Sequence, residues 1–136
     1  MKQKKFDIRL AQNFTLYEFI VSDTASKKKI NEQYYIDFTI VENLQNLCIN
    51  ILQQVRNLCG KVEILSGYRC ERLNHAVQGV DNSQHLTGCA ADISVRDLNQ
   101  AIEVVKMLEF DQLVIYHNFI HVSFSPKRLR KQIIHK

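Results

Sequence analysis

The 136-residue chain has no tryptophan, one proline and four glycines, so residues that interrupt regular structure are rare. It contains neither an internal repeat nor a low-complexity segment. Hydrophobic residues make up 46% and charged residues 24% of the chain, which is typical of a globular protein with an ordinary core. A chain of this length most simply forms one domain.

Long hydrophobic runs are also missing. No stretch approaches the ~20 apolar residues that a membrane-spanning helix needs. The lysines near the N-terminus are not followed by the apolar stretch of a signal peptide. We therefore expect a protein without a membrane span, made in the cytoplasm. Action outside the cell would then depend on release or transport by another agent.

Paired cysteine motifs are absent as well. The four cysteines form no CxxC pair and no zinc-ribbon spacing. Reduced thiols are the expectation for a chain without a secretion signal. Cys48 and Cys59, eleven residues apart on one predicted helix, are interpreted as small buried hydrophobic residues.

The charge balance is mildly basic. Eighteen Lys and Arg residues against 14 Asp and Glu give a formal charge of +4, with the excess concentrated in residues 1–5 and 126–136. Such an excess favours polyanions, either nucleic acid or the anionic polymers of a bacterial wall, although solvated tails explain it equally. No basic face interleaved with aromatic residues and no recognition-helix pattern is present, so nucleic-acid binding is not expected.

The clearest predicted element is a long helix over about residues 37–59, because apolar residues recur there at helical spacing. Thr39 and Glu42 fit a capping box at its start, and Gly60 is a suitable stop. A short helix is predicted to start at Thr15, where Glu18 completes a capping box. Two more helices are predicted over residues 71–77 and 98–108, and Asp97 is the expected N-cap of the last one. Residues 22–29 are expected to form a loop. The apolar stripe of the long helix consists of Ile40, Leu44, Leu47, Cys48, Ile51, Val55 and Leu58.

Four strands are predicted, over 62–66, 89–95, 112–116 and 119–124. His117 and Asn118 would form a two-residue hairpin turn between the last two, since Asn accepts a positive φ. The fold class is therefore α+β, a small antiparallel sheet with helices on one face and the site on the other. We expect a lead-in over 1–13, one domain over 14–125, and a basic, partly helical tail over 126–136.

One histidine and one aspartate lie close together in the sequence, at His85 and Asp92, with a glycine and small residues between them. Strand alternation places Asp92 and His121 on the same polar face of the sheet. Two imidazoles and one carboxylate with an open fourth position are typical of a catalytic zinc site. These three residues are therefore the predicted metal ligands.

Several blocks in the same order resemble the zinc D-Ala-D-Ala carboxypeptidase family of metallopeptidases. The resemblance covers roughly residues 13–125, and is closest to the small phage- and prophage-encoded members. The blocks are Phe14-Thr15-Leu16-Tyr17-Glu18-Phe19, Ser22-Asp23-Thr24-Ala25, Ser66-Gly67-Tyr68-Arg69, Leu73-Asn74, Ala76-Val77, Gly79-Val80, Ser83-Gln84-His85 with Gly88, Ala90-Ala91-Asp92, Asp111-Gln112-Leu113 and Ile120-His121-Val122-Ser123.

The resemblance implies a fold also found in hedgehog signalling domains. It also implies a one-zinc peptidase that cleaves peptidoglycan stem peptides, as a D-Ala-D-Ala carboxypeptidase or an L-Ala-D-Glu endopeptidase. By motif position, Arg69 would hold a substrate carboxylate or the developing oxyanion, for which a planar guanidinium is suited. Ser66 and Ser83 would add hydrogen bonds to substrate, and Gln84 would orient a ligand. A monomer is expected, acting on the wall after release or within a phage particle.

One position departs from the family pattern. Its members usually carry an acidic general base shortly before the last histidine, often three residues earlier, where this chain has Asn118. His117 can substitute, because imidazole titrates near neutral pH. Asp111 is the other nearby acid, but is expected at the far end of its strand. The alternatives are a less obvious base, a slow enzyme, or a catalytically impaired zinc-stabilised module that binds cell wall or belongs to a virion.

Overall fold

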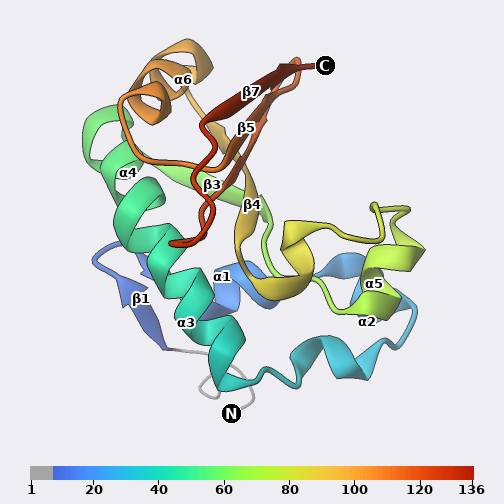
Figure 1. Cartoon of the computed structure of the whole chain (residues 1–136). Coiled ribbons are helices and arrows are strands. Elements are labelled where there is room, and N and C mark those ends of the chain that lie inside the picture. Colours follow the sequence, from blue (N-terminus) through green and yellow to red (C-terminus); the bar gives the residue numbers. More distant parts are fainter. Residues whose placement is uncertain (1–7) are drawn as a thin grey trace.

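The computed structural model describes residues 8–136. Residues 1–7, and with them part of the predicted lead-in and the first basic cluster, lie outside the described residues. Within the described part, helices pack against a five-stranded sheet, and a two-stranded sheet lies at the N-terminal end of the chain (Figure 1). The predicted α+β class is confirmed. No helix in residues 8–136 is long and apolar enough to cross a membrane.

The main sheet has the strand order β3-β4-β6-β5-β7, with β5 and β7 parallel and the other neighbours antiparallel. The four predicted strands are confirmed as β3, β4, β5 and β6. In the register of β4 and β6, Asp92 lies directly opposite His121. The strands span Val62–Ser66 (β3), Ala90–Val95 (β4), Gln112–Ile115 (β5), Ile120–Ser123 (β6) and Gln132–His135 (β7).

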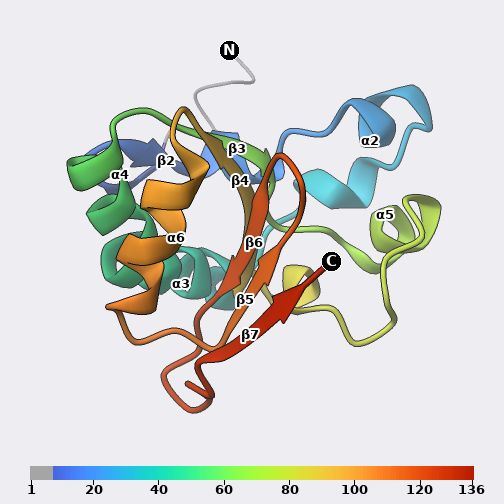
Figure 2. The same ribbon diagram turned by 90° about the horizontal axis from the view of Figure 1, so that it is seen from above.

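Helices α3, α4 and α6 cover one face of this sheet, while α2 and α5 lie on the other side, near the candidate site (Figure 2). The main core lies between the first group and the sheet, and a smaller apolar cluster lies under α2 and α5. The helices that border the core are α3 (Phe38–Leu47), a π-helical turn η3 (Cys48–Leu52), α4 (Gln53–Cys59) and α6 (Leu98–Lys106).

Two of the three predicted helix caps are confirmed and one is wrong. The Glu18 carboxylate accepts a hydrogen bond from the Thr15 backbone N–H at 2.9 Å, and Asp97 caps α6 as predicted. The long helix begins at residue 37 as predicted, but its N-cap is Asp37, whose Oδ1 accepts from the Ile40 N–H at 3.0 Å. An aspartate at the N-cap satisfies the same free backbone donors that a Thr39–Glu42 capping box would, so that prediction is wrong.

The remaining elements lie at the N-terminus and around the site. Residues 22–29 are not a loop throughout, because the Ser22 hydroxyl accepts from the Ala25 N–H at 3.1 Å and starts a short helix there. These elements are β1 (Arg9–Ala11), β2 (Phe14–Thr15), α1 (Leu16–Ile20), α2 (Asp23–Lys27), η2 (Asn31–Tyr34), α5 (Glu71–Ala76) and η4 (Gln84–Thr87).

The C-terminal segment forms a strand rather than a partly helical tail. β7 lies beside β5 and extends the sheet (Figures 1 and 2). Leu129 packs against the main core on the way to it. The predicted turn at His117 and Asn118 is present, closed by a hydrogen bond from the Tyr116 N–H to the Phe119 carbonyl at 3.0 Å. Neither turn residue has a positive φ, so the turn does not depend on the tolerance of Asn118 for that conformation, contrary to the prediction from the sequence.

Candidate metal centre

The middle of the main sheet presents the candidate centre. Asp92 lies on β4 between its two neighbouring strands, paired with Ser66 of β3 on one side and His121 of β6 on the other. Paired residues on adjacent strands share a face, so all three side chains emerge on the face opposite α3, α4 and α6. His85 approaches this face from the turn η4.

The three predicted ligands converge. One nitrogen of each histidine and one oxygen of Asp92 all lie within 4.8 Å of one another. His121 Nδ1 is 2.9 Å and His85 Nε2 is 3.3 Å from the same atom, Asp92 Oδ1. His85 is 2% exposed and the other two are half-buried, so the cluster opens to solvent on one side only.

The backbone fixes which nitrogen of His85 is available. Its Nδ1 lies 2.6 Å from the Gly67 carbonyl oxygen, which can only accept a hydrogen bond. Nδ1 therefore donates this hydrogen bond, and Nε2 is the nitrogen that faces Asp92. The carbonyl of His85 in turn accepts from the Arg69 N–H at 3.0 Å, so the Gly67–Arg69 segment holds this ligand at two points.

The Asp92 carboxyl is held in its ionised form. Burial raises its pKa, but hydrogen bonds from His121 and His85 and the charge on those rings lower it by more, and the result lies well below the ordinary range. An ionised carboxylate is the form that binds a metal.

Arg69 and Ser66 lie beside the cluster, on the wall of a cleft of about 450 Å³ formed by β3, the 67–69 segment, α5 and the start of α2. Burial lowers the pKa of the Arg69 guanidinium, while the Coulombic interactions with Asp92 and Tyr116 partly offset that effect. Its buried Nε has no hydrogen-bond partner in the described part of the chain. A buried, unpartnered donor is costly, which suits a residue that binds an anionic ligand.

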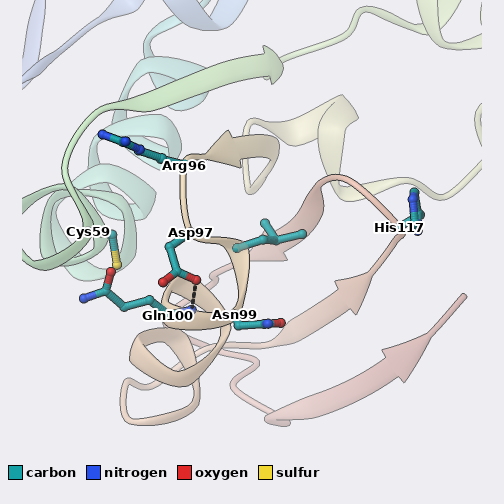
Figure 3. A pocket seen from close by; sticks show the side chains of 7 residues that line it. Cys59, Arg96, Asp97, Asn99, Gln100 and His117 are labelled. Carbon is teal, nitrogen blue, oxygen red and sulfur yellow. Dashed lines mark hydrogen bonds between the residues drawn. The ribbon is translucent and has the colours of Figure 1, made fainter.

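Two other predicted site residues are placed elsewhere. The Ser83 hydroxyl accepts from the His85 N–H at 3.1 Å and caps η4. His117 is exposed at its turn, on the wall of a different cavity of about 610 Å³, apart from the other labelled side chains in Figure 3. It is not in the group of converging ligand atoms, so this placement gives no geometric support to its predicted role as a base.

The other nearby acid, Asp111, is also unsuited to act as a base. It is fully buried and bonded to Arg130 and Gln84. Burial raises the pKa of its carboxyl, but the hydrogen bonds and charge of Arg130 lower it by more. A carboxylate held ionised by a guanidinium has little tendency to take up a proton. Gln84, expected to orient a ligand directly, contacts Asp111 instead.

The sequence interpretation missed Tyr116. Phe119 lies two residues before His121 and so points to the same face of the sheet. Tyr116 lies opposite Phe119 across the hairpin, so both aromatic rings share the face of the site. The rings stack at 4.3 Å between centroids, with an angle of 8° between their planes. The phenol interacts electrostatically with Arg69, the predicted substrate clamp. Strand alternation applied to the whole hairpin was the available signal.

Comparison with known families agrees with this geometry. A family model described as Peptidase M15 matches residues 12–123. The chain belongs to the peptidase M15 family. This confirms the resemblance to the zinc D-Ala-D-Ala carboxypeptidase-like metallopeptidases. No curated protein matches the chain.

The residues present fit the metal that an M15 peptidase uses. Two imidazole nitrogens and a carboxylate oxygen lie close enough to bind one ion, and one imidazole already has its second nitrogen bonded to a carbonyl. Three protein ligands leave a fourth position for water or substrate, as in catalytic zinc sites.

Proposed function

We propose that this M15 protein is a zinc-dependent peptidase that cleaves peptidoglycan stem peptides. The observation that carries the proposal is the convergence of His85, Asp92 and His121, whose ligand atoms all lie within 4.8 Å of one another. Zinc, when bound, supplies Lewis acidity to the scissile carbonyl and to an attacking water. Borderline-soft imidazole ligands with one carboxylate favour zinc over calcium or magnesium.

The chain's own residues supply binding and orientation. Arg69 binds an anionic group of the substrate, either a terminal carboxylate or the oxygen of the carbonyl under attack. Ser66, on the same cleft wall, adds a hydrogen bond. The Gly67 carbonyl keeps the His85 ring in one orientation and one tautomer.

A second function is supported by the proton-transfer side of the site. Asn118 replaces the usual acid, His117 lies on another cavity, and Asp111 is bound to Arg130. These placements favour a zinc-stabilised module that binds cell wall or belongs to a virion without rapid turnover. Both functions fit a phage-derived monomer that acts after release from the cell or within a particle.

Turnover separates the two. Purified zinc-loaded protein is incubated with stem peptides, and the products are identified by mass spectrometry. Released D-Ala indicates a carboxypeptidase, and a split between L-Ala and D-Glu an endopeptidase. A signal no greater than that of a His85→Ala control rules out the enzyme. Retained binding to wall fragments would then support the module.

A further inference from the structure

A buried carboxylate connects the C-terminal segment to the turn that carries His85. Asp111 Oδ1 accepts from the Nε and the backbone N–H of Arg130, at 2.6 and 3.2 Å. Asp111 Oδ2 accepts from Arg130 Nη2 at 2.9 Å and from Gln84 Nε2 at 3.0 Å. A carboxylate offers about four acceptor sites, so this one is saturated. Arg130 and Gln84 therefore meet on one fully buried group.

The backbone on either side holds Arg130 in place. The Lys131 N–H donates to the Phe110 carbonyl at 3.0 Å, and the Gln132 N–H to the Asp111 carbonyl at 2.9 Å. Leu129 packs against the core. The guanidinium thus reaches Asp111 from a segment that is itself fixed to the sheet, and its two parallel hydrogen bonds set the plane of the carboxylate.

Gln84 transmits this constraint to the metal centre. It is the residue before His85, and its carbonyl accepts from the Cys89 N–H at 3.0 Å, which closes the turn η4. At the other end of the turn, Asn43 Nδ2 donates to the Thr87 carbonyl at 2.9 Å. The Asp111 contact ties η4 to β5, while Gly67 and Arg69 hold His85 from the β3 side.

We propose that Arg130 and Asp111 are positioning residues for the metal centre, which hold Gln84 and, through it, the turn that presents His85. The inference rests on the proposed metal site. Polar groups that bind no metal themselves commonly set the orientation of the ligands that do. The Asp111 carboxylate at the centre of the network is fully buried and accepts four hydrogen bonds, which limits its movement and suits that role.

Metal affinity measures this role directly. The full chain is stripped with a chelator, and Zn²⁺ is titrated in competition with a chromophoric chelator. We expect Arg130→Gln and Gln84→Ala each to weaken zinc binding about 10–100-fold. The double variant should bind zinc no more than about threefold more weakly than whichever single variant has the lower affinity. The two losses should not multiply, because both residues act through Asp111. Arg130→Lys restores the charge but not the two-pronged geometry, and should recover affinity in part.

Gln132→Ala is the matched control. It removes the 2.7 Å side-chain hydrogen bond to Gln112 from the same segment, keeps the backbone bond to Asp111 and leaves the Asp111 carboxylate unchanged, so it should bind zinc as the wild type does. The visible spectrum of bound Co²⁺ should change in Arg130→Gln and stay unchanged in this control.

Three outcomes would overturn the proposal. A folded Arg130→Gln protein with wild-type zinc affinity would do so, as would losses that multiply in the double variant. Should Arg130→Gln fail to fold by circular dichroism, wild-type affinity in Gln84→Ala has the same meaning. A wild-type chain that binds no zinc would refute the metal centre itself, which distinguishes that failure from a failure of the positioning role alone.

Discussion

At the scale of single residues, the convergence of the three predicted ligands was predictable and their surroundings were not. His85, Asp92 and His121 follow from residue type, spacing and strand alternation, all of which are properties of the sequence. The Gly67 carbonyl that orients His85 belongs to the backbone, and no residue pattern encodes a main-chain acceptor. The position of His117 was not predictable either. The direction of a side chain at a turn depends on the backbone angles there, and strand alternation does not predict those angles.

The role of Arg69 can be tested by changing the substrate as well as the protein. Arg69→Lys keeps the charge but loses the planar fork that matches a carboxylate. For stem peptides with a free C-terminal carboxylate, we expect kcat/KM to fall about 10–100-fold, since hydrogen bonds to charged groups contribute about 1.5–3 kcal/mol. Peptides with an amidated C-terminus should be nearly unaffected. An equal loss on both peptides would show that Arg69 acts on the scissile carbonyl instead.

At the scale of elements, one helix shows why a correct periodicity can still misplace residues. The apolar stripe predicted Leu58 as buried, yet it is 59% exposed, while Leu52, outside the stripe, is fully buried. The π-helical turn η3 adds a residue to the winding, so Leu52 turns toward the core and Leu58 away from it, while Val55 stays buried as predicted. The spacing of apolar residues cannot reveal that extra residue, because apolar residues occur both on the predicted stripe and on the face that is buried after the turn.

The packing of α3 gives a prediction for this element. Leu44 is fully buried against the core, and its side chain lies close to Gly88 at the end of η4. Leu44→Ala should lower the free energy of unfolding by about 2–5 kcal/mol, through lost burial and a residual cavity. Urea unfolding measures the change. The control Ile49→Ala, half-exposed in the π-helical turn η3 that follows α3, should stay within about 0.5 kcal/mol of the wild type.

At the scale of the whole molecule, the α+β class and four of five main-sheet strands were predicted, but the fifth was not. Residues 126–136 are rich in Lys and Arg, and only four of them form a short strand. Their place in the sheet involves the pairing of β7 with β5 and the ion pair of Arg130 with Asp111, and neither contact can be seen in the local sequence pattern. The division of the chain at residues 13 and 125 stays a prediction.

Metal binding should stabilise the whole fold, because the ligands come from three separate segments. Zinc at about 100 times its Kd adds about 2.7 kcal/mol to the free energy of unfolding if the unfolded chain does not bind it. The Tm of the wild type should rise by several degrees on adding zinc and return with a chelator. The Tm of Asp92→Asn should not rise on adding zinc. An equal rise of the Tm in this variant would show that the metal binds elsewhere.

The ion pair between buried Asp111 and Arg130 predicts an acid sensitivity. The folded-state pKa of Asp111 lies below its unfolded value, so its contribution to stability is present above about pH 4 and is lost as the pH falls further. In metal-free protein, the free energy of unfolding should fall more steeply below about pH 5 in the wild type than in Asp111→Asn. Parallel pH profiles for the two proteins would contradict the assignment.

β7 also determines which strand lies at the margin of the sheet. Without it, β5 would present Leu113, Val114 and Ile115 with a row of unpaired backbone groups, a template for pairing with another chain. β7 covers that row with a short strand flanked by Lys131 and Lys136, whose charges oppose further pairing. A chain cut after Ser125 would therefore be expected to aggregate through β5, even if its remaining core folded.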